Sequence, residues 1–236
     1  MNLAELQAVE THKTLNPNLW DNHSLKPEVR SKLLEIAKHF VDFINIPNLD
    51  LTDITISGSN ASYGYSKHSD VDLHLIARIP KDHPDLKELF DAKKNQYNST
   101  YKITIKDIPV EVYVQDSSQP HHSAGIYSIQ RNKWLSKPTE LTPEVDPKAI
   151  KNKARNYAGK INQALRSNDL NTAKETMDHI YRLRKAGLEG NGEYSVENLA
   201  FKLLRARGQI DKLRKRIDHL QSKQLSLGEH QWKLKI

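Results

Sequence analysis

The sequence predicts an α/β (α+β) protein, with a mixed-sheet core at residues 1–140 and a basic all-α helical domain at 146–236. Apolar and polar residues alternate over Asp53–Ser57 and again over residues 70–78, which is the two-residue period of half-buried strands. After the proline-bearing stretch 138–147, apolar residues instead recur every three or four positions, which is typical of amphipathic helices. A sheet followed by helices indicates two packed layers and then a bundle.

The core segments are expected in the order helix, strand, loop, strand, helix, strand, strand. A helix over residues 27–45 is indicated by an apolar stripe and by Pro27, whose missing N–H costs nothing in a first turn. We expect a surface helix over 84–97 and a shorter helix over 3–14. The last two strands, Tyr101–Lys106 and Val110–Gln115, should form a hairpin around a turn at residues 107–109.

The helical part is predicted to contain helices over residues 148–166, 170–187 and 195–222, with glycine-bearing residues 187–192 separating the last two. Residues 146–236 hold 20 of the 36 Lys and Arg residues and 10 of the 29 Asp and Glu residues, a net charge of +10. Residues 1–145 have a net charge of −3. Such an asymmetry favours an anionic partner for the helical part, and RNA or another nucleic acid is the leading candidate.

Composition excludes several classes of protein. The chain has no cysteine, so disulfides, thiolate metal sites and cysteine nucleophiles are excluded. No run of about 18 apolar residues exists to span a bilayer. The first residues lack the basic and apolar regions of a secretory signal. We therefore expect a soluble cytoplasmic protein without a membrane partner.

The residues with the strongest chemical implication run from Gly58-Ser59 to Asp70-Val71-Asp72. Residues i and i+2 of a strand point to one face, so Asp70 and Asp72 should project side by side. Two adjacent ionised carboxylates repel each other and need a cation, and hard oxygen ligands favour Mg²⁺ or Mn²⁺. Gly58 would let the backbone approach a polyphosphate closely, and Ser59 adds a hydroxyl donor.

A third carboxylate, Glu111, lies in the apolar strand Pro109–Val114. If that strand pairs beside the strand of Asp70 and Asp72, the three acids form a cluster able to hold two metals roughly 3.5–4 Å apart. Asp107 and Asp116 compete for the third position. Glu111 is preferred because Asp107 falls in a turn and Asp116 at a strand end.

This constellation resembles the nucleotidyltransferase superfamily that includes DNA polymerase beta. That family's pattern is a Gly-Ser turn after a strand, a strand bearing Asp-x-Asp, and a third acid on a later strand. Here Gly58-Ser59, Asp70-Val71-Asp72 and Glu111 match it, with Glu in place of the more usual Asp. The helical tail is similar to extensions of uncharacterised nucleotidyltransferase-like proteins, some of them from bacteriophages.

The resemblance implies a metal-dependent transfer of a nucleotide from an NTP such as ATP, with Mg²⁺ or Mn²⁺ bound by the three acids. It implies that Gly58 and Ser59 hold the triphosphate. Ser69 and Lys67, which precede the acids, are further candidates for contact with the nucleotide. Neither a Walker loop nor a dinucleotide-binding glycine pattern is present to suggest another phosphate site.

Several alternatives remain open. The acceptor could be RNA such as tRNA, a protein or a small molecule, and a toxin or defence-type transferase would share the chemistry. A non-catalytic nucleotide-binding module and a metal-dependent hydrolase are the other classes. The basic helices could bind nucleic acid, could be ordinary solvated surfaces, or could cap the triphosphate through Arg182, Arg184 and Lys185. Residues that could line the pocket, or belong to a surface loop or strand, are His74, His121, His122, Tyr127 and Trp134.

Overall fold

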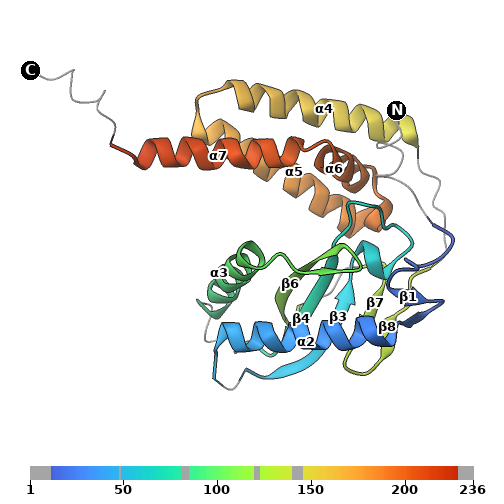
Figure 1. The fold of residues 1–236 in the computed structure, drawn as a ribbon. Helices are drawn as coiled ribbons and strands as arrows, with labels where there is room; N and C mark the ends of the chain where they lie inside the picture. Colours follow the sequence, from blue (N-terminus) through green and yellow to red (C-terminus); the bar gives the residue numbers. More distant parts are fainter. Residues whose placement is uncertain (1–11, 48, 81–84, 120–122, 140–145, 228–236) are drawn as a thin grey trace, which may run out of the picture. The chain divides into compact units, whose positions relative to one another are not determined.

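The computed structural model describes residues 12–47, 49–80, 85–119, 123–139 and 146–227 of the 236-residue chain. These residues form two compact units, one within residues 10–142 and the other within residues 143–236 (Figure 1). The first is a mixed sheet with helices and the second contains only helices, so the fold class expected from the sequence is confirmed. The predicted helix over 3–14 lies almost entirely outside the described residues. In the described part of the chain, no helix is long and apolar enough to cross a membrane.

The first unit is built on a six-stranded sheet of order β5-β6-β4-β3-β7-β8. All neighbouring strands are antiparallel except β4 and β6, which are parallel and are connected through helix α3. A separate two-stranded ribbon, β1 and β2, precedes helix α2. The elements are β1 (Trp20–Asp21), β2 (Ser24–Leu25), α2 (Pro27–Ile44), β3 (Leu51–Ser57), the 3₁₀ turn η1 (Ser59–Ala61), β4 (Val71–Ala77), α3 (Asp85–Thr100), β5 (Thr104–Ile105), β6 (Ile108–Asp116), β7 (Ile126–Ser128) and β8 (Lys133–Ser136).

The two faces of this sheet differ in chemistry. One face is apolar, and α2 and α3 cover it with side chains that include Leu33, Phe40 and Phe90. The buried strand residues against these helices are Ile56, Val71, Leu73, Leu75, Val110 and Val112. The residues between them point to the opposite face, which therefore collects the polar side chains of three neighbouring strands. The alternation seen in the sequence thus separates a core from a polar surface on one sheet.

Several elements of the first unit differ from the prediction in their bounds or were not predicted. The hairpin turn is the pair Lys106 and Asp107, whose φ values of 49° and 64° belong to a two-residue loop, so Ile108 and Pro109 already lie in β6. Strand β5 is only two residues long, whereas Tyr101–Lys106 was predicted. Strands β7 and β8 were not predicted, because three or four residues are too few to show a period.

The described residues of the second unit form four helices around one apolar core. They are α4 (Pro147–Arg166), α5 (Leu170–Asn191), α6 (Val196–Ala206) and α7 (Gln209–Leu225), with a 3₁₀ turn η2 (Gly192–Tyr194) before α6. Asp146 caps α4, Asp169 caps α5 and Ser195 caps α6, each through its side chain. The core is lined by residues from all four helices, including Ile161, Ile180, Leu204 and Leu213.

Two predictions about these helices are wrong. The segment 195–222 is not one helix, because Gly208 adopts φ +68° and breaks the chain between α6 and α7. Helix α5 does not end at Gly187 but continues to Asn191. Gly187 lies inside the helix at a point where a Cβ would lie 2.7 Å from Ser195 Oγ and 2.8 Å from Glu197 Cβ. It therefore allows α5 to approach the start of α6 closely.

Candidate active site

The acids predicted from the sequence meet on the polar face of the sheet. Strands β4 and β6 pair in parallel with Asp72 directly opposite Glu111. Residues directly opposite each other point to the same face of a sheet, so these two carboxylates are neighbours. Asp70 lies immediately before β4, two residues from Asp72, and is 8% exposed. Of the competitors, Asp116 pairs with Ala77 at the other end of the strands, and Asp107 lies in the hairpin turn.

Gly58 follows β3 and faces Asp72 across the strand pair. The last residue of β3, Ser57, pairs with Asp72. Gly58 has φ +73° and ψ −158°, a conformation that is essentially restricted to glycine. A Cβ on this residue would lie 2.0 Å from Asp72 Oδ2. The missing side chain therefore allows the Asp72 carboxylate to lie directly against the backbone of Gly58.

The serines of the motif form one hydroxyl cluster beside this glycine. Ser59 Oγ donates to Ser69 Oγ at 2.9 Å, and Ser69 Oγ also accepts the backbone N–H of Ser66 at 2.9 Å. Ser59 begins the 3₁₀ turn η1, so both ends of the loop from Gly58 to Asp70 are joined at this point. Lys67 lies apart from the cluster, in the exposed turn closed by the bond from Ser69 N to Ser66 O.

A residue that the sequence reasoning missed, Asn60, holds this loop together. It is 0% exposed, and its Nδ2 donates to the backbone carbonyl of Asp70 at 2.8 Å. Its Oδ1 accepts from Asn16 at 2.8 Å, and its backbone carbonyl accepts from Trp20 Nε1 at 2.7 Å. The segment before α2 is thereby fastened to the loop that leads into the acids. Nothing in the local sequence marks Asn60, because all of its partners are ten or more residues away.

A second missed residue, Tyr113, lies on β6 two positions after Glu111 and shares its face. Its hydroxyl donates a hydrogen bond to Glu111 Oε2. Its ring stacks on His74 with centroids 5.1 Å apart, and Lys94 Nζ of α3 lies 5.2 Å from its centroid. The two-residue period that placed Glu111 would also have placed Tyr113.

The electrostatics of this tyrosine reflect the acids around it. Burial raises the pKa of the Tyr113 hydroxyl far above its usual range. The negative charges of Asp72, Glu111 and Asp70, together with the hydrogen bond to Glu111, raise this pKa further. The hydroxyl therefore keeps its proton and acts toward Glu111 only as a donor. The negative charges of all three predicted acids therefore act on this one hydroxyl.

The chemical type of these side chains suits a divalent cation. The donors are carboxylate oxygens, the ligands that Mg²⁺ and Mn²⁺ prefer, and any side chain at Gly58 would displace the Asp72 carboxylate. Within the described ranges, however, no three Asp, Glu or His side chains converge closely enough to make a complete metal site. Mg²⁺ typically binds through one or two carboxylates plus substrate phosphates, so the remaining ligands would come from the nucleotide.

Other candidates of the sequence analysis have different roles. Tyr127 and Trp134 pair across β7 and β8 and pack with Trp20, with ring centroids 5.1 Å and 4.8 Å from it. Tyr127 lies opposite Ile56 and hence on the apolar side of the sheet, so its assignment to a pocket or a surface loop is wrong. His121 and His122 lie outside the described residues. Arg184 Nε donates to Asn198 Oδ1 at 3.1 Å, and the guanidinium lies over the Phe201 ring, both within the helical unit.

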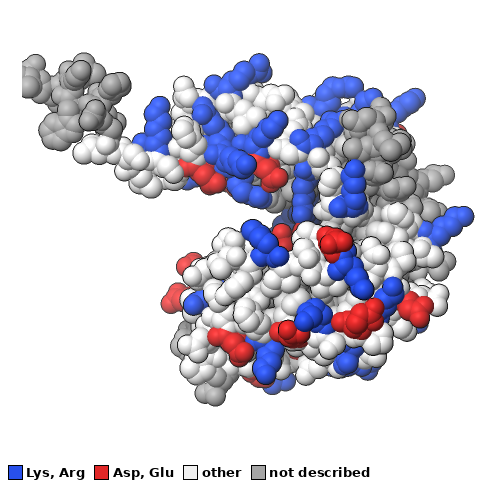
Figure 2. Space-filling model, in the orientation of Figure 1, with Lys and Arg blue, Asp and Glu red and all other residues white. Residues whose placement is uncertain are grey.

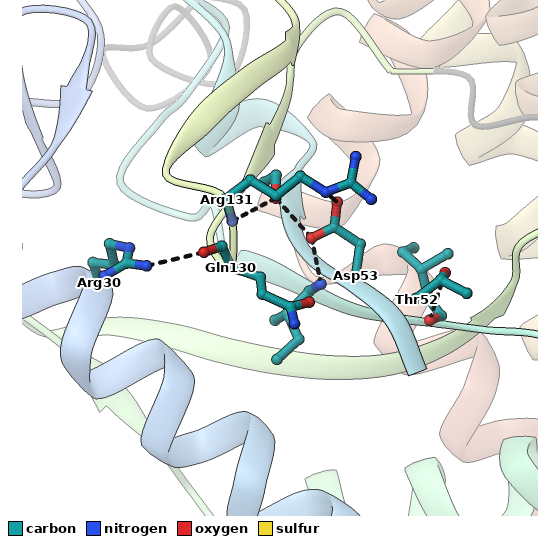
Figure 3. Close-up of polar contacts among 8 residues, drawn as sticks. Arg30, Thr52, Asp53, Gln130 and Arg131 are labelled. Atoms are coloured by element: carbon teal, nitrogen blue, oxygen red, sulfur yellow. Dashed lines mark hydrogen bonds and ion pairs between the residues drawn. The ribbon is translucent and has the colours of Figure 1, made fainter. Parts of the chain in front are cut away.

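Asp53 of β3 is another buried acid on the sheet, and its contacts hold the fold together (Figure 3). Its Oδ1 accepts from Ser128 Oγ at 2.6 Å and from the N–H of Ile54, and its Oδ2 faces Arg131 Nε at 3.4 Å. Arg30 of α2 donates to the carbonyls of the neighbouring residues Ile129 and Gln130. Asp53 thus joins β3 to β7 and to the segment after it.

No protein-family model matches this chain, and no curated protein is similar to it. Solved structures similar to it include a STING-associated CdnE c-di-GMP synthase from Capnocytophaga granulosa, at 16% identity and TM-score 0.25 over 85% of this chain and 84% of that chain. The E. coli MS115-1 CdnC:HORMA-deltaN complex matches at 14% identity and TM-score 0.25, over 85% of this chain and 92% of that chain. At these TM-scores neither likeness carries an argument about the activity of this chain.

Proposed function

We propose that this protein is a nucleotidyltransferase that moves a nucleoside monophosphate from an NTP to an acceptor and releases pyrophosphate. The observation that carries the proposal is the pairing of Asp72 with Glu111, with the Asp72 carboxylate held directly against the Gly58 turn. This arrangement offers carboxylates for a cation beside a glycine turn and its cluster of serine hydroxyls, which could donate to a polyphosphate. It supports the family resemblance of the sequence motif independently of any comparison.

In this reaction an oxygen of the acceptor forms a bond to the α-phosphorus, and the bond from the α-phosphorus to the pyrophosphate oxygen breaks. Asp70, Asp72 and Glu111 would hold Mg²⁺ or Mn²⁺, which supplies charge neutralisation for the triphosphate and the leaving pyrophosphate. Glu111 would orient the acceptor hydroxyl and accept its proton, and Tyr113 would keep the Glu111 carboxylate in one orientation. Ser59 and Ser69 would direct their hydroxyls to phosphate oxygens, exchanging the bond that they now share.

The test is to add the pure protein to cell lysate together with Mg²⁺ or Mn²⁺ and one α-³²P-labelled NTP at a time. The mixture is then separated into RNA, protein and small-molecule fractions. We expect label in one fraction and release of pyrophosphate. The fraction identifies the acceptor as RNA, protein or small molecule. Asp72→Asn should remove the labelling, whereas Asp42→Asn, an exposed acid on α2, should not. Labelling that persists in Asp72→Asn would overturn the mechanism.

A further inference from the structure

Helix α4 carries an unusual surface, because it contains six Lys and Arg residues and no Asp or Glu. The other helices of the same unit mix the two signs. Five of the six cations are exposed, namely Lys148, Lys151, Arg155, Lys160 and Arg166. Among the described residues none of these five has a carboxylate partner within ion-pair distance, whereas the sixth, Lys153, pairs with Glu197 at 3.0 Å. Solubility alone does not require a helix of one sign.

The apolar side of α4 faces the helical core, through residues such as Ala154, Tyr157 and Ile161. Lys148, Lys151, Arg155 and Arg166 therefore lie on the opposite side, and Lys160 lies at its edge toward α5. We name the surface of these five cations the α4 basic face. Lys148, Lys151 and Arg155 follow the spacing of one helical row, and at about 1.5 Å per residue Lys148 and Arg166 are separated by roughly 27 Å along the axis. The exposed positions between the cations include the amides Asn152, Asn156, Asn162 and Gln163. Figure 2 shows Lys and Arg side chains spread over the visible side of the helical unit, with Asp and Glu sparse among them.

The positive potential continues onto α5. Lys160 Nζ lies 2.9 Å from His179 Nε2. Burial lowers the pKa of His179, and the charges of Lys160 and Arg182 lower it further. The charges of Lys160 and Arg182 thus both act at the edge between α4 and α5. Neither cation has a carboxylate partner among the described ion pairs, so this edge is available to an anion.

The chemistry of the α4 basic face selects among polyanions. A bilayer would require an apolar side to insert, and the apolar side of α4 is already buried in the helical core. A protein interface would require aromatic or aliphatic anchors, which the exposed positions of α4 lack. Single-stranded nucleic acid is usually held by stacking on aromatic rings, and these too are missing from this face. Lysine, arginine and amide donors repeated along a straight element match the phosphates of a duplex.

We propose that the α4 basic face binds the phosphate backbone of double-stranded nucleic acid. The proposal names a partner for the helical unit. It rests on the proposed function only for the purpose of the binding, and the binding itself does not depend on nucleotidyl transfer. Over about 27 Å a duplex presents roughly eight phosphates on each strand, so several of the five exposed cations can be engaged together. No base-specific readout is required, and recognition should depend on charge and shape.

The experiment measures fluorescence anisotropy of labelled 20-bp RNA and DNA duplexes with the full chain at several salt concentrations. Lys151→Gln/Arg155→Gln on α4 is compared with Lys212→Gln/Lys215→Gln on α7, which removes the same charge from exposed positions of a helix that also bears acids. We expect the α4 pair to weaken binding at least 10-fold and to reduce the slope of log K against log salt by about 2. The α7 pair should change affinity less than 3-fold.

Three outcomes would overturn the proposal. They are equal losses in both double variants, no binding of either duplex at low salt, and binding of anionic lipid vesicles or single strands in preference to duplexes. Binding is measured without NTP and repeated with Asp72→Asn, so it does not depend on catalysis. Duplex binding without nucleotidyl transfer would reject only the proposed function. Transfer without duplex binding would reject only the α4 basic face.

Discussion

Gly58 and Asp72 are so close that a Cβ on residue 58 would lie 2.0 Å from Asp72 Oδ2. The contact joins the two halves of the sequence motif, since Gly58 follows β3 and Asp72 lies on β4. Gly58→Ala would add strain at φ +73° and would displace the carboxylate. We expect nucleotidyl transfer to fall at least 100-fold and the free energy of unfolding to fall by about 1–3 kcal/mol.

The control for Gly58→Ala is Gly159→Ala in α4, where a Cβ meets nothing within 4 Å. This substitution should leave the activity unchanged and raise the free energy of unfolding by up to about 1 kcal/mol, because alanine favours a helix over glycine. Urea unfolding and pyrophosphate release measure the two quantities. Wild-type activity in Gly58→Ala would show that the close approach to Asp72 is unimportant.

Tyr113→Phe removes only the hydroxyl that bonds to Glu111. Because the carboxylate then loses its fixed orientation, we expect kcat to decrease roughly 10-fold with little change in KM for the NTP, in line with a hydrogen bond to a charged group. The midpoint of activity against Mg²⁺ concentration should move to higher metal. Steady-state kinetics at varied metal tests this, with Tyr181→Phe as the control, since that hydroxyl bonds to Arg214 in the helical unit. A decrease in KM alone, or equal effects of both variants, would contradict it.

Gly187→Ala should destabilise the helical unit. The added methyl would meet Ser195 Oγ at 2.7 Å and Glu197 Cβ at 2.8 Å, so α5 and α6 must separate. Overpacking of this kind costs about 1–3 kcal/mol in the free energy of unfolding. Gly190→Ala lies in the same helix with nothing within 4 Å and should be neutral or slightly stabilising. Thermal melts of the two variants make the comparison, and identical melts would show that α5 can shift without loss.

The ion pair between Lys153 and Glu197 predicts a pH dependence of stability. The hydrogen bond from Lys153 lowers the pKa of Glu197 below its ordinary value of 4.5. A folded pKa below the unfolded pKa means that the stabilisation is complete above about pH 4.5 and is lost as the pH falls through the folded pKa. Because both side chains are partly exposed, the contribution is less than about 1 kcal/mol. In urea unfolding, the free energy of unfolding of the wild type should exceed that of Glu197→Gln at pH 7, and this difference should shrink toward pH 3. A constant difference would assign the effect to packing.

The strands of the candidate site could be predicted because their pattern is local. Alternation placed Asp70 and Asp72 on one face, and the same period placed Glu111, before any pairing of strands was known. The parallel pairing that brings Asp72 opposite Glu111 had to be assumed, because it depends on the path of the chain through α3 and not on the local pattern. The partners of Asn60, at residues 16, 20 and 70, are likewise set by the fold and leave no mark on neighbouring positions.

The errors have physical causes too. Asp107-Ile108-Pro109 contains typical turn residues, but the turn needs φ > 0 at Lys106 and Asp107, and Pro109 is accommodated in β6 opposite the two-residue strand β5. The apolar stripe over 195–222 continues in phase across Gly208, so periodicity alone did not reveal the break. Tyr127 was considered only for a pocket or a surface loop, whereas it packs edge-on against Trp20 in the core.

The difference between the two faces of the sheet has a consequence for how this sequence can change in length. Apolar and polar residues alternate along β4 and β6, so inserting or deleting one residue in β6 ahead of Glu111 would turn the acid toward Phe90 and α3 and move Val112 to the polar face in its place. Point substitutions on either face alter one side chain, but a single-codon shift would exchange the two faces along the whole strand. Homologous chains, when aligned, should therefore vary in length in the connections between strands and keep the spacing from the hairpin turn to Glu111 fixed.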